Sequence, residues 1–140
     1  MIQEHTLSWT RTQSAARLHA YRMLFLITIA GNVLIGLWCL FAPADFAQHV
    51  HQPGPTSDAW PRAWALAWLG LNLLYLPGVV NPLFYRWPNW SSIVINLAMG
   101  IAFLALGGGF VALAIWALAA GILLLIAYYR LILADVQSKP

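Results

Sequence analysis

The sequence predicts an all-α integral membrane protein: a bundle of four transmembrane helices with both termini in the cytoplasm. Of its 140 residues, 61% are hydrophobic and only 8% are charged, whereas a soluble domain carries about 25% charged residues. Long uncharged stretches alternate with short polar segments, and most lysines and arginines fall where a four-span topology puts one side of the membrane. A net charge of +3 is too small to indicate a nucleic-acid partner.

The first two spans lie in separate uncharged stretches, residues 23–44 and 63–85. A helix needs about 20 apolar residues to cross a hydrocarbon core of about 30 Å. Each stretch therefore predicts one spanning helix, near residues 20–42 and 61–80. Proline lacks the backbone N–H that continues a helix, so Pro82 marks the end of the second span.

The third uncharged stretch, residues 87–129, is long enough for two helices. Three consecutive glycines at 107–109 divide it, and glycine adopts the backbone conformations that a tight hairpin needs. The sequence therefore predicts the third and fourth spans near residues 89–106 and 110–133.

The basic residues predict the orientation, because cytoplasmic loops carry an excess of lysine and arginine. Both termini and the inner loop 81–88 are expected in the cytoplasm, with the outer loop 43–60 and the glycine hairpin outside. The segment 9–22 is expected either to lie as a basic helix on the inner membrane face or to extend the first span. The inner side then carries Arg11, Arg17, Arg22, Arg86, Arg130 and Lys139, and the outer side carries only Arg62.

Aromatic residues agree with this orientation, since tryptophan and tyrosine settle at headgroup depth. Trp38, Trp60 and Trp64 are expected at the outer interface. The inner interface is expected to hold Tyr85, Trp87, Trp90, Tyr128 and Tyr129.

Three asparagines, Asn32, Asn72 and Asn96, place side-chain amides at similar depth on three of the four spans. An unpaired amide in hydrocarbon costs several kcal/mol, so we expect them to face one another inside the bundle. The nearest polar group on the fourth span is the N–H of Trp116. Two interpretations stay open: interhelical packing bonds worth about 0.6–2 kcal/mol each, or a midplane pocket for a quinone, a lipid headgroup or another small molecule.

Two further features are candidates for ligand contact. Trp60, Trp64 and Trp68 are four residues apart and form a stripe on the second span. Such a stripe can stack on a lipid or an aromatic ligand, anchor the helix at the interface or contact a partner helix. Arg86, between two aromatic residues, suits an anionic lipid headgroup or serves as a positive-inside anchor.

His49 and His51 form the only closely spaced histidine pair, near Asp45 and Asp58 in the outer loop. The pair suggests a zinc or copper site, or two solvated histidines, because nothing fixes a third ligand. The single cysteine, Cys39, gives no disulfide framework. Catalytic motifs are absent, so the sequence does not favour an enzyme and requires no cofactor.

Residues 62–86 carry a family resemblance. They resemble the second span of small four-helix bacterial membrane proteins of the DoxX-like and BphX-like groups. The resemblance implies a four-helix bundle in a bacterial plasma (inner) membrane, where some such proteins are associated with quinone-linked redox complexes. It transfers no catalytic residue. The matching positions are Arg62, Gly70, Tyr75, Leu76, Asn81, Pro82, Tyr85 and Arg86.

The sequence leads to three functional hypotheses. The first is a non-catalytic accessory or assembly subunit of a membrane complex, or a homo-oligomer, that acts by helix packing among membrane lipids. The second is a quinone-binding or lipid-binding module that uses Asn32, Asn72 and Asn96. The third is a metal-handling protein that uses His49 and His51.

Overall fold

Every regular element is a helix in the computed structural model, which describes residues 2–52 and 57–137, with side chains for 13–52 and 57–136. Four segments are long and apolar enough to cross a membrane: Gln13–Phe41, Ala59–Val80, Arg86–Leu106 and Phe110–Val136. The all-α class and the four helices of spanning length are thus confirmed. The helices are α1 (Ile2–Phe41), α2 (Pro43–His49), α3 (Ala59–Leu74), α4 (Leu76–Val80), α5 (Arg86–Leu106) and α6 (Phe110–Gln137).

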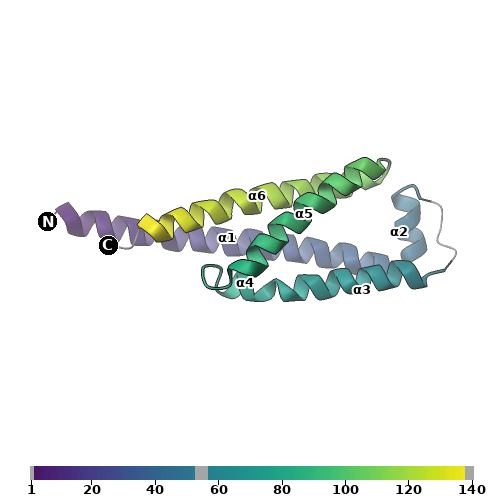
Figure 1. The fold of residues 1–140 in the computed structure, drawn as a ribbon, viewed down its shortest axis with the longest axis horizontal. Helices are drawn as coiled ribbons and strands as arrows, with labels where there is room; N and C mark the ends of the chain where they lie inside the picture. Colours follow the sequence, from purple (N-terminus) through teal and green to yellow (C-terminus); the bar gives the residue numbers. More distant parts are fainter. Residues whose placement is uncertain (1, 53–56, 138–140) are drawn as a thin grey trace.

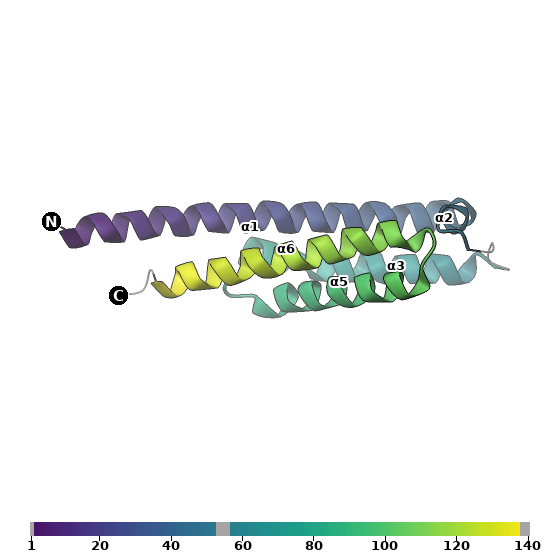
Figure 2. The same cartoon turned by 90° about the horizontal axis from the view of Figure 1, so that it is seen from above.

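The long helices run side by side, and both chain ends lie at one end of the bundle (Figures 1 and 2). We call this the terminal end and the opposite one, which carries α2, the α2 end. Helix α1 packs against α3 and α6, and α5 packs against α6. In Figure 1, α5 starts beside α4 and crosses toward α6, so that α3 and α5 diverge toward the α2 end.

The polar segment after α1 is not only loop. Its first part forms α2, which begins with Pro43 in the first turn and buries Phe46 and Ala47. Proline is well placed in a first turn because the N–H it lacks would have no helical partner there. At the other side, α1 continues without a break through residues 9–22. This segment is therefore an extension of the first long helix and not a separate element.

A break separates α3 from α4 near Pro77. The chain turns at Tyr75, and Pro77 has no N–H to continue the helical hydrogen bonds. Arg22 of α1 donates hydrogen bonds to the last backbone carbonyls of α4. Its Nε donates to the carbonyl of Val79 at 3.0 Å, and a terminal guanidinium nitrogen donates to the carbonyl of Val80. The arginine thus ties the α3–α4 end to α1.

The glycine hairpin joins α5 and α6 as the sequence predicted. Gly107 and Gly108 have φ values of 69° and 56°, a region that only glycine adopts without strain. Gly109 serves a different purpose, because a side chain there would overlap the backbone of His49 and Val50. The hairpin therefore lies directly against the end of α2.

An aromatic core fills the terminal half of the bundle, around Tyr21, Phe25, Tyr75 and Tyr128. The expectation that Tyr128 marks a membrane interface is wrong, since this side chain is fully buried. Successive helical residues point about 100° apart, so only one of the tyrosine pair faces outward. That residue is Tyr129, which is 60% exposed.

Candidate functional site

The three asparagines meet in the middle of the bundle. Asn32, Asn72 and Asn96 are all buried, with 2%, 0% and 1% of their surface exposed. The Nδ2 of Asn32 donates to the Oδ1 of Asn72 at 3.2 Å and to the Oδ1 of Asn96 at 3.5 Å. One side chain of α1 thus connects α3 and α5 through hydrogen bonds. We call these three residues the amide cluster.

Two tryptophans and two backbone carbonyls complete the amide cluster. The Nε1 of Trp116 donates to the Oδ1 of Asn32 at 3.0 Å, which brings in α6. The Nδ2 of Asn72 donates to the carbonyl of Trp68, and that of Asn96 to the carbonyl of Ser92, both at 2.8 Å. Each carboxamide oxygen and nitrogen therefore has a protein partner, so the geometry favours packing over ligand capture here.

The position of Trp116 depends on its neighbour Gly31. A Cβ at Gly31 would overlap the indole ring of Trp116. The sequence showed Trp116 as the polar group of the fourth span, but it did not show that Gly31 makes room for the ring. A glycine directly before a buried asparagine was the available signal.

A second polar group lies at the terminal end, and sequence reasoning missed it. The hydroxyl of Tyr21 donates to the Oδ1 of Asn89 at 2.8 Å, and the Nδ2 of Asn89 donates to the carbonyls of Pro82 and Tyr85 at 2.9 and 2.8 Å. The hydroxyl of Tyr128 reaches the same Pro82 carbonyl at 3.2 Å. These bonds hold the turn between α4 and α5 against α1 and α6.

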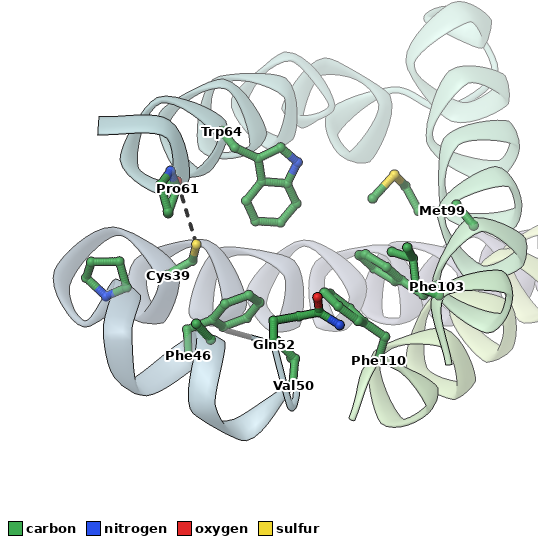
Figure 3. Close-up of a pocket in the computed structure, with 13 residues that line it drawn as sticks. Cys39, Phe46, Val50, Gln52, Pro61, Trp64, Met99, Phe103 and Phe110 are labelled. Carbon is green, nitrogen blue, oxygen red and sulfur yellow. Dashed lines mark hydrogen bonds between the residues drawn. The ribbon is translucent and has the colours of Figure 1, made fainter. Parts of the chain in front are cut away.

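The α2 end contains a cavity of about 460 Å³, which we call the apolar chamber (Figure 3). It exists because α3 stays with α1 while α5 stays with α6, and α2 folds back beside the gap. Trp64 projects into it from α3 and Met99 from α5. Its lining residues are Cys39, Pro43, Phe46, Ala47, Val50, Gln52, Pro61, Trp64, Met99, Ala102, Phe103, Leu106 and Phe110.

The members of the tryptophan stripe have separate positions. Trp60 is 82% exposed and faces away from the bundle. The rings of Trp64 and Trp68 are stacked, with centroids 5.8 Å apart and planes within 9°. Trp64 lines the apolar chamber, and Trp68 donates from Nε1 to the backbone carbonyl of Asn32 at 3.1 Å. The stacked pair therefore links the chamber to the amide cluster.

The histidine pair makes local contacts at the α2 end. The Nδ1 of His49 lies 2.9 Å from the carbonyl oxygen of Asp45 and 3.4 Å from its Oδ1. The carboxylate of Asp45 also accepts a 2.7 Å bond from Trp38, and His51 is exposed. Among the residues with described side chains, no group of three potential metal ligands forms. The geometry therefore supplies no third ligand for the metal hypothesis.

Arg86, the other candidate ligand residue, begins α5 at the terminal end and is exposed. Its Nε donates to the carbonyl of Leu83 at 3.2 Å, within its own turn. This contact stabilises the connection between α4 and α5.

No family model, curated protein or solved structure matches this chain. The resemblance of residues 62–86 to the DoxX-like and BphX-like groups therefore stays a prediction.

Proposed function

We propose that this chain is a non-catalytic membrane module that binds one apolar or amphipathic small molecule, a quinone or a lipid, in the apolar chamber. The polarity of the bundle supports membrane insertion. Leu34, Leu73 and Ile101 are 68%, 64% and 64% exposed, while Asn32 and Asn72 are buried. A bilayer favours apolar side chains outside and requires polar groups to be satisfied inside.

The apolar chamber is the observation that carries the proposal. Ligand cavities typically enclose about 300–1,000 Å³ and combine apolar walls with a few polar groups. At about 460 Å³ the chamber falls in this range, and Gln52 contributes the one carboxamide among the lining residues that the structure describes. A long apolar ligand fits these walls, with one polar head group near Gln52.

The side chains that line the chamber support binding of a ligand and not its chemical conversion. The described residues that line it include no carboxylate, imidazole or amine, the groups that usually transfer protons in enzymes. The thiol of Cys39 is buried and lies 3.6 Å from the carbonyl oxygen of Pro61. A reactive cysteine instead needs a neighbouring base or positive charge to form its thiolate.

The amide cluster supports the chamber from the side nearer the terminal end. Because Trp68 is bonded to Asn32 and stacked on Trp64, the cluster fixes one wall of the chamber. In this proposal the asparagines are packing residues, and the ligand binds one to two helical turns nearer the α2 end.

Native mass spectrometry of the gently solubilised protein tests the proposal. We expect one retained apolar molecule per chain, and its mass identifies the class. Ala102→Trp fills the chamber from its α5 rim and should abolish retention. Ala105→Trp is the matched control, because Ala105 is exposed on the same helix and is not part of the lining.

The only cysteine of the sequence, Cys39, supplies a second readout. It lies in the chamber wall. Its modification by N-ethylmaleimide at alkaline pH, where part of the thiol ionises, should be slow and should become slower still when a molecule is bound. We expect decylubiquinone or a monoacyl lipid to protect the thiol in the wild type and in Ala105→Trp. Absence of any retained molecule, together with unchanged labelling at saturating probe, contradicts the proposal.

A second candidate function, the accessory subunit or homo-oligomer, has its own supporting observation. Ala63, Ala67 and Gly70 form an exposed stripe of small residues on α3. A side chain at Gly70 would meet no atom within 4 Å. Small residues let helices approach closely in membranes, so this face suits a partner helix.

The mass of the native complex distinguishes this second candidate. If α3 binds a partner helix, Gly70→Ile should release it, whereas Ala98→Ile, on an exposed position of α5, should not. A monomer that carries a bound small molecule favours the first candidate.

A further inference from the structure

A groove of about 630 Å³ lies between α1 and α6 at the terminal end, away from the apolar chamber. The lining positions of α1 are three and four residues apart, and those of α6 follow the same spacing in two adjacent rows, so each helix contributes one continuous face. The lining residues are Arg17, Ala20 and Leu24 of α1, and Leu123, Ile126, Ala127, Arg130 and Leu133 of α6. Two guanidinium groups thus share a groove whose other walls are apolar.

A hydrogen bond holds the two cationic residues at the same level. Nη1 of Arg17 donates to the backbone carbonyl of Arg130 at 3.3 Å. Both side chains line the same groove, so an anion bound there is stabilised by two positive charges. The neighbouring Arg22 is directed to the carbonyls of α4. Asp135 lies five residues beyond Arg130, about 140° around the helix, and thus on another face of α6.

The apolar part of the groove continues from the arginines toward the middle of the bundle. Leu24 and Leu123 are each seven residues from the arginine of their own helix, about 10 Å along the axis. Ala20 and Ala127 are small and keep the groove open between these levels. Arginine near the end of a spanning helix extends its charge to the headgroup layer. The groove therefore has a cationic mouth at headgroup depth and an apolar trench below it.

We propose that this groove binds one anionic phospholipid. Its phosphate lies between the guanidinium groups of Arg17 and Arg130, and an acyl chain follows the trench past Ala20 and Ala127. Guanidinium pairs phosphate through two parallel hydrogen bonds, which a zwitterionic lipid satisfies less well because its own cation competes. The site rests on the proposed membrane insertion and is independent of ligand binding in the apolar chamber.

Native mass spectrometry with defined lipids tests the site. The purified protein is delipidated and titrated with phosphatidylglycerol or with phosphatidylcholine of identical acyl chains. The wild type should bind the first phosphatidylglycerol more tightly than phosphatidylcholine. Each basic residue near a membrane surface strengthens anionic binding about fivefold, so Arg17→Gln and Arg130→Gln should each lose about that factor. Arg62→Gln is the matched control for the loss of one positive charge, since Arg62 is exposed at the α2 end and is not part of the groove.

Two more variants separate a lipid from a free anion. Ala127→Leu fills the trench but keeps both charges, so it should weaken the binding of phosphatidylglycerol. Glycerol phosphate, which has no acyl chain, should fail to compete with phosphatidylglycerol for the wild type. Arg130→Lys keeps the charge, so its affinity for phosphatidylglycerol should lie between those of the wild type and Arg130→Gln. Such partial retention would show that the fold tolerates a change at this position. Equal binding of the two lipids by the wild type, an Arg62→Gln loss as large as that of Arg130→Gln, or displacement by glycerol phosphate overturns the proposal. Retention in the chamber, read through Cys39, is unaffected by any of these outcomes.

Discussion

Asn32 is the hub of the bundle, because its one carboxamide contacts side chains of the other three long helices. It donates to Asn72 and Asn96 and accepts from Trp116. Interhelical polar bonds in membranes contribute about 0.6–2 kcal/mol each. We expect Asn32→Leu to lower the free energy of unfolding by about 2–4 kcal/mol. Asn96→Leu, which removes the longest bond, should cost about 1 kcal/mol.

Reversible unfolding by sodium dodecyl sulfate in mixed micelles measures these differences. Gln48→Leu is the control, because it removes an exposed carboxamide from α2. The Asn32→Leu/Asn72→Leu pair should be non-additive, since both variants remove the same bond. Additive and small effects would show that the amide cluster is not what holds the helices together.

The contact between Gly31 and Trp116 can be tested separately. Its missing Cβ leaves room for the ring of Trp116, so Gly31→Ala should displace that ring and break its bond to Asn32. Forcing extra atoms into a packed interior costs about 1–3 kcal/mol. In a Trp116→Phe background this cost should shrink. Gly70→Ala, with open space at the Cβ position, should instead be neutral or slightly stabilising, as measured by the same unfolding assay.

Helix α2 closes one side of the apolar chamber, and the glycine hairpin holds it there. Because a side chain at Gly109 would overlap His49 and Val50, Gly109→Ala should push α2 away and speed the modification of Cys39 by N-ethylmaleimide. Gly108→Ala is the control. It strains a residue with φ of 56°, but its nearest neighbour would be 3.8 Å away. Equal labelling rates in both variants would show that hairpin strain, not contact with α2, controls access.

The short helix α4 depends on Arg22, because Pro77 interrupts the hydrogen bonds that would join it to α3. Arg22→Gln removes the guanidinium bonds to Val79 and Val80. A hydrogen bond from a charged group contributes about 1.5–3 kcal/mol, so backbone amides near Gly78 should exchange with deuterium at least about tenfold faster. Hydrogen exchange with mass spectrometry measures this, and Arg62→Gln, a change at the opposite end of α3, should leave that segment unchanged.

The long helices were predictable because a fixed bilayer thickness demands about 20 apolar residues, and charges and glycines divide the chain at that length. Helix α2 was not predictable, since seven residues give too little periodicity to distinguish a short helix from a loop. The meeting of the asparagines followed from the cost of an isolated amide in hydrocarbon. The hydrogen bonds to the backbone carbonyls of Trp68 and Ser92 could not be predicted, because backbone carbonyls carry no sequence signal.

At the scale of the whole molecule, the two candidate binding sites arise from how the helices diverge. The apolar chamber needs α3 and α5 to separate at the α2 end, and the arginine groove needs α1 and α6 to present Arg17 and Arg130 together. Crossing angles depend on side chains at each helix contact, far apart in sequence. The sequence therefore indicated the three asparagines as candidates, used Arg17 and Arg130 only to predict orientation, and gave no signal for either cavity.

The orientation of the bundle decides which leaflet of the membrane each site meets. Arg17, Arg86 and Arg130 all lie toward the terminal end, which the positive-inside rule places in the cytoplasm. Single-cysteine variants in a Cys39→Ser background test this in intact cells with a membrane-impermeant maleimide. Ser57→Cys, exposed at the α2 end, should react at once. Val136→Cys, 63% exposed at the terminal end, should react only after permeabilisation. The reverse pattern would put the apolar chamber in the inner leaflet and the arginine groove in the outer one.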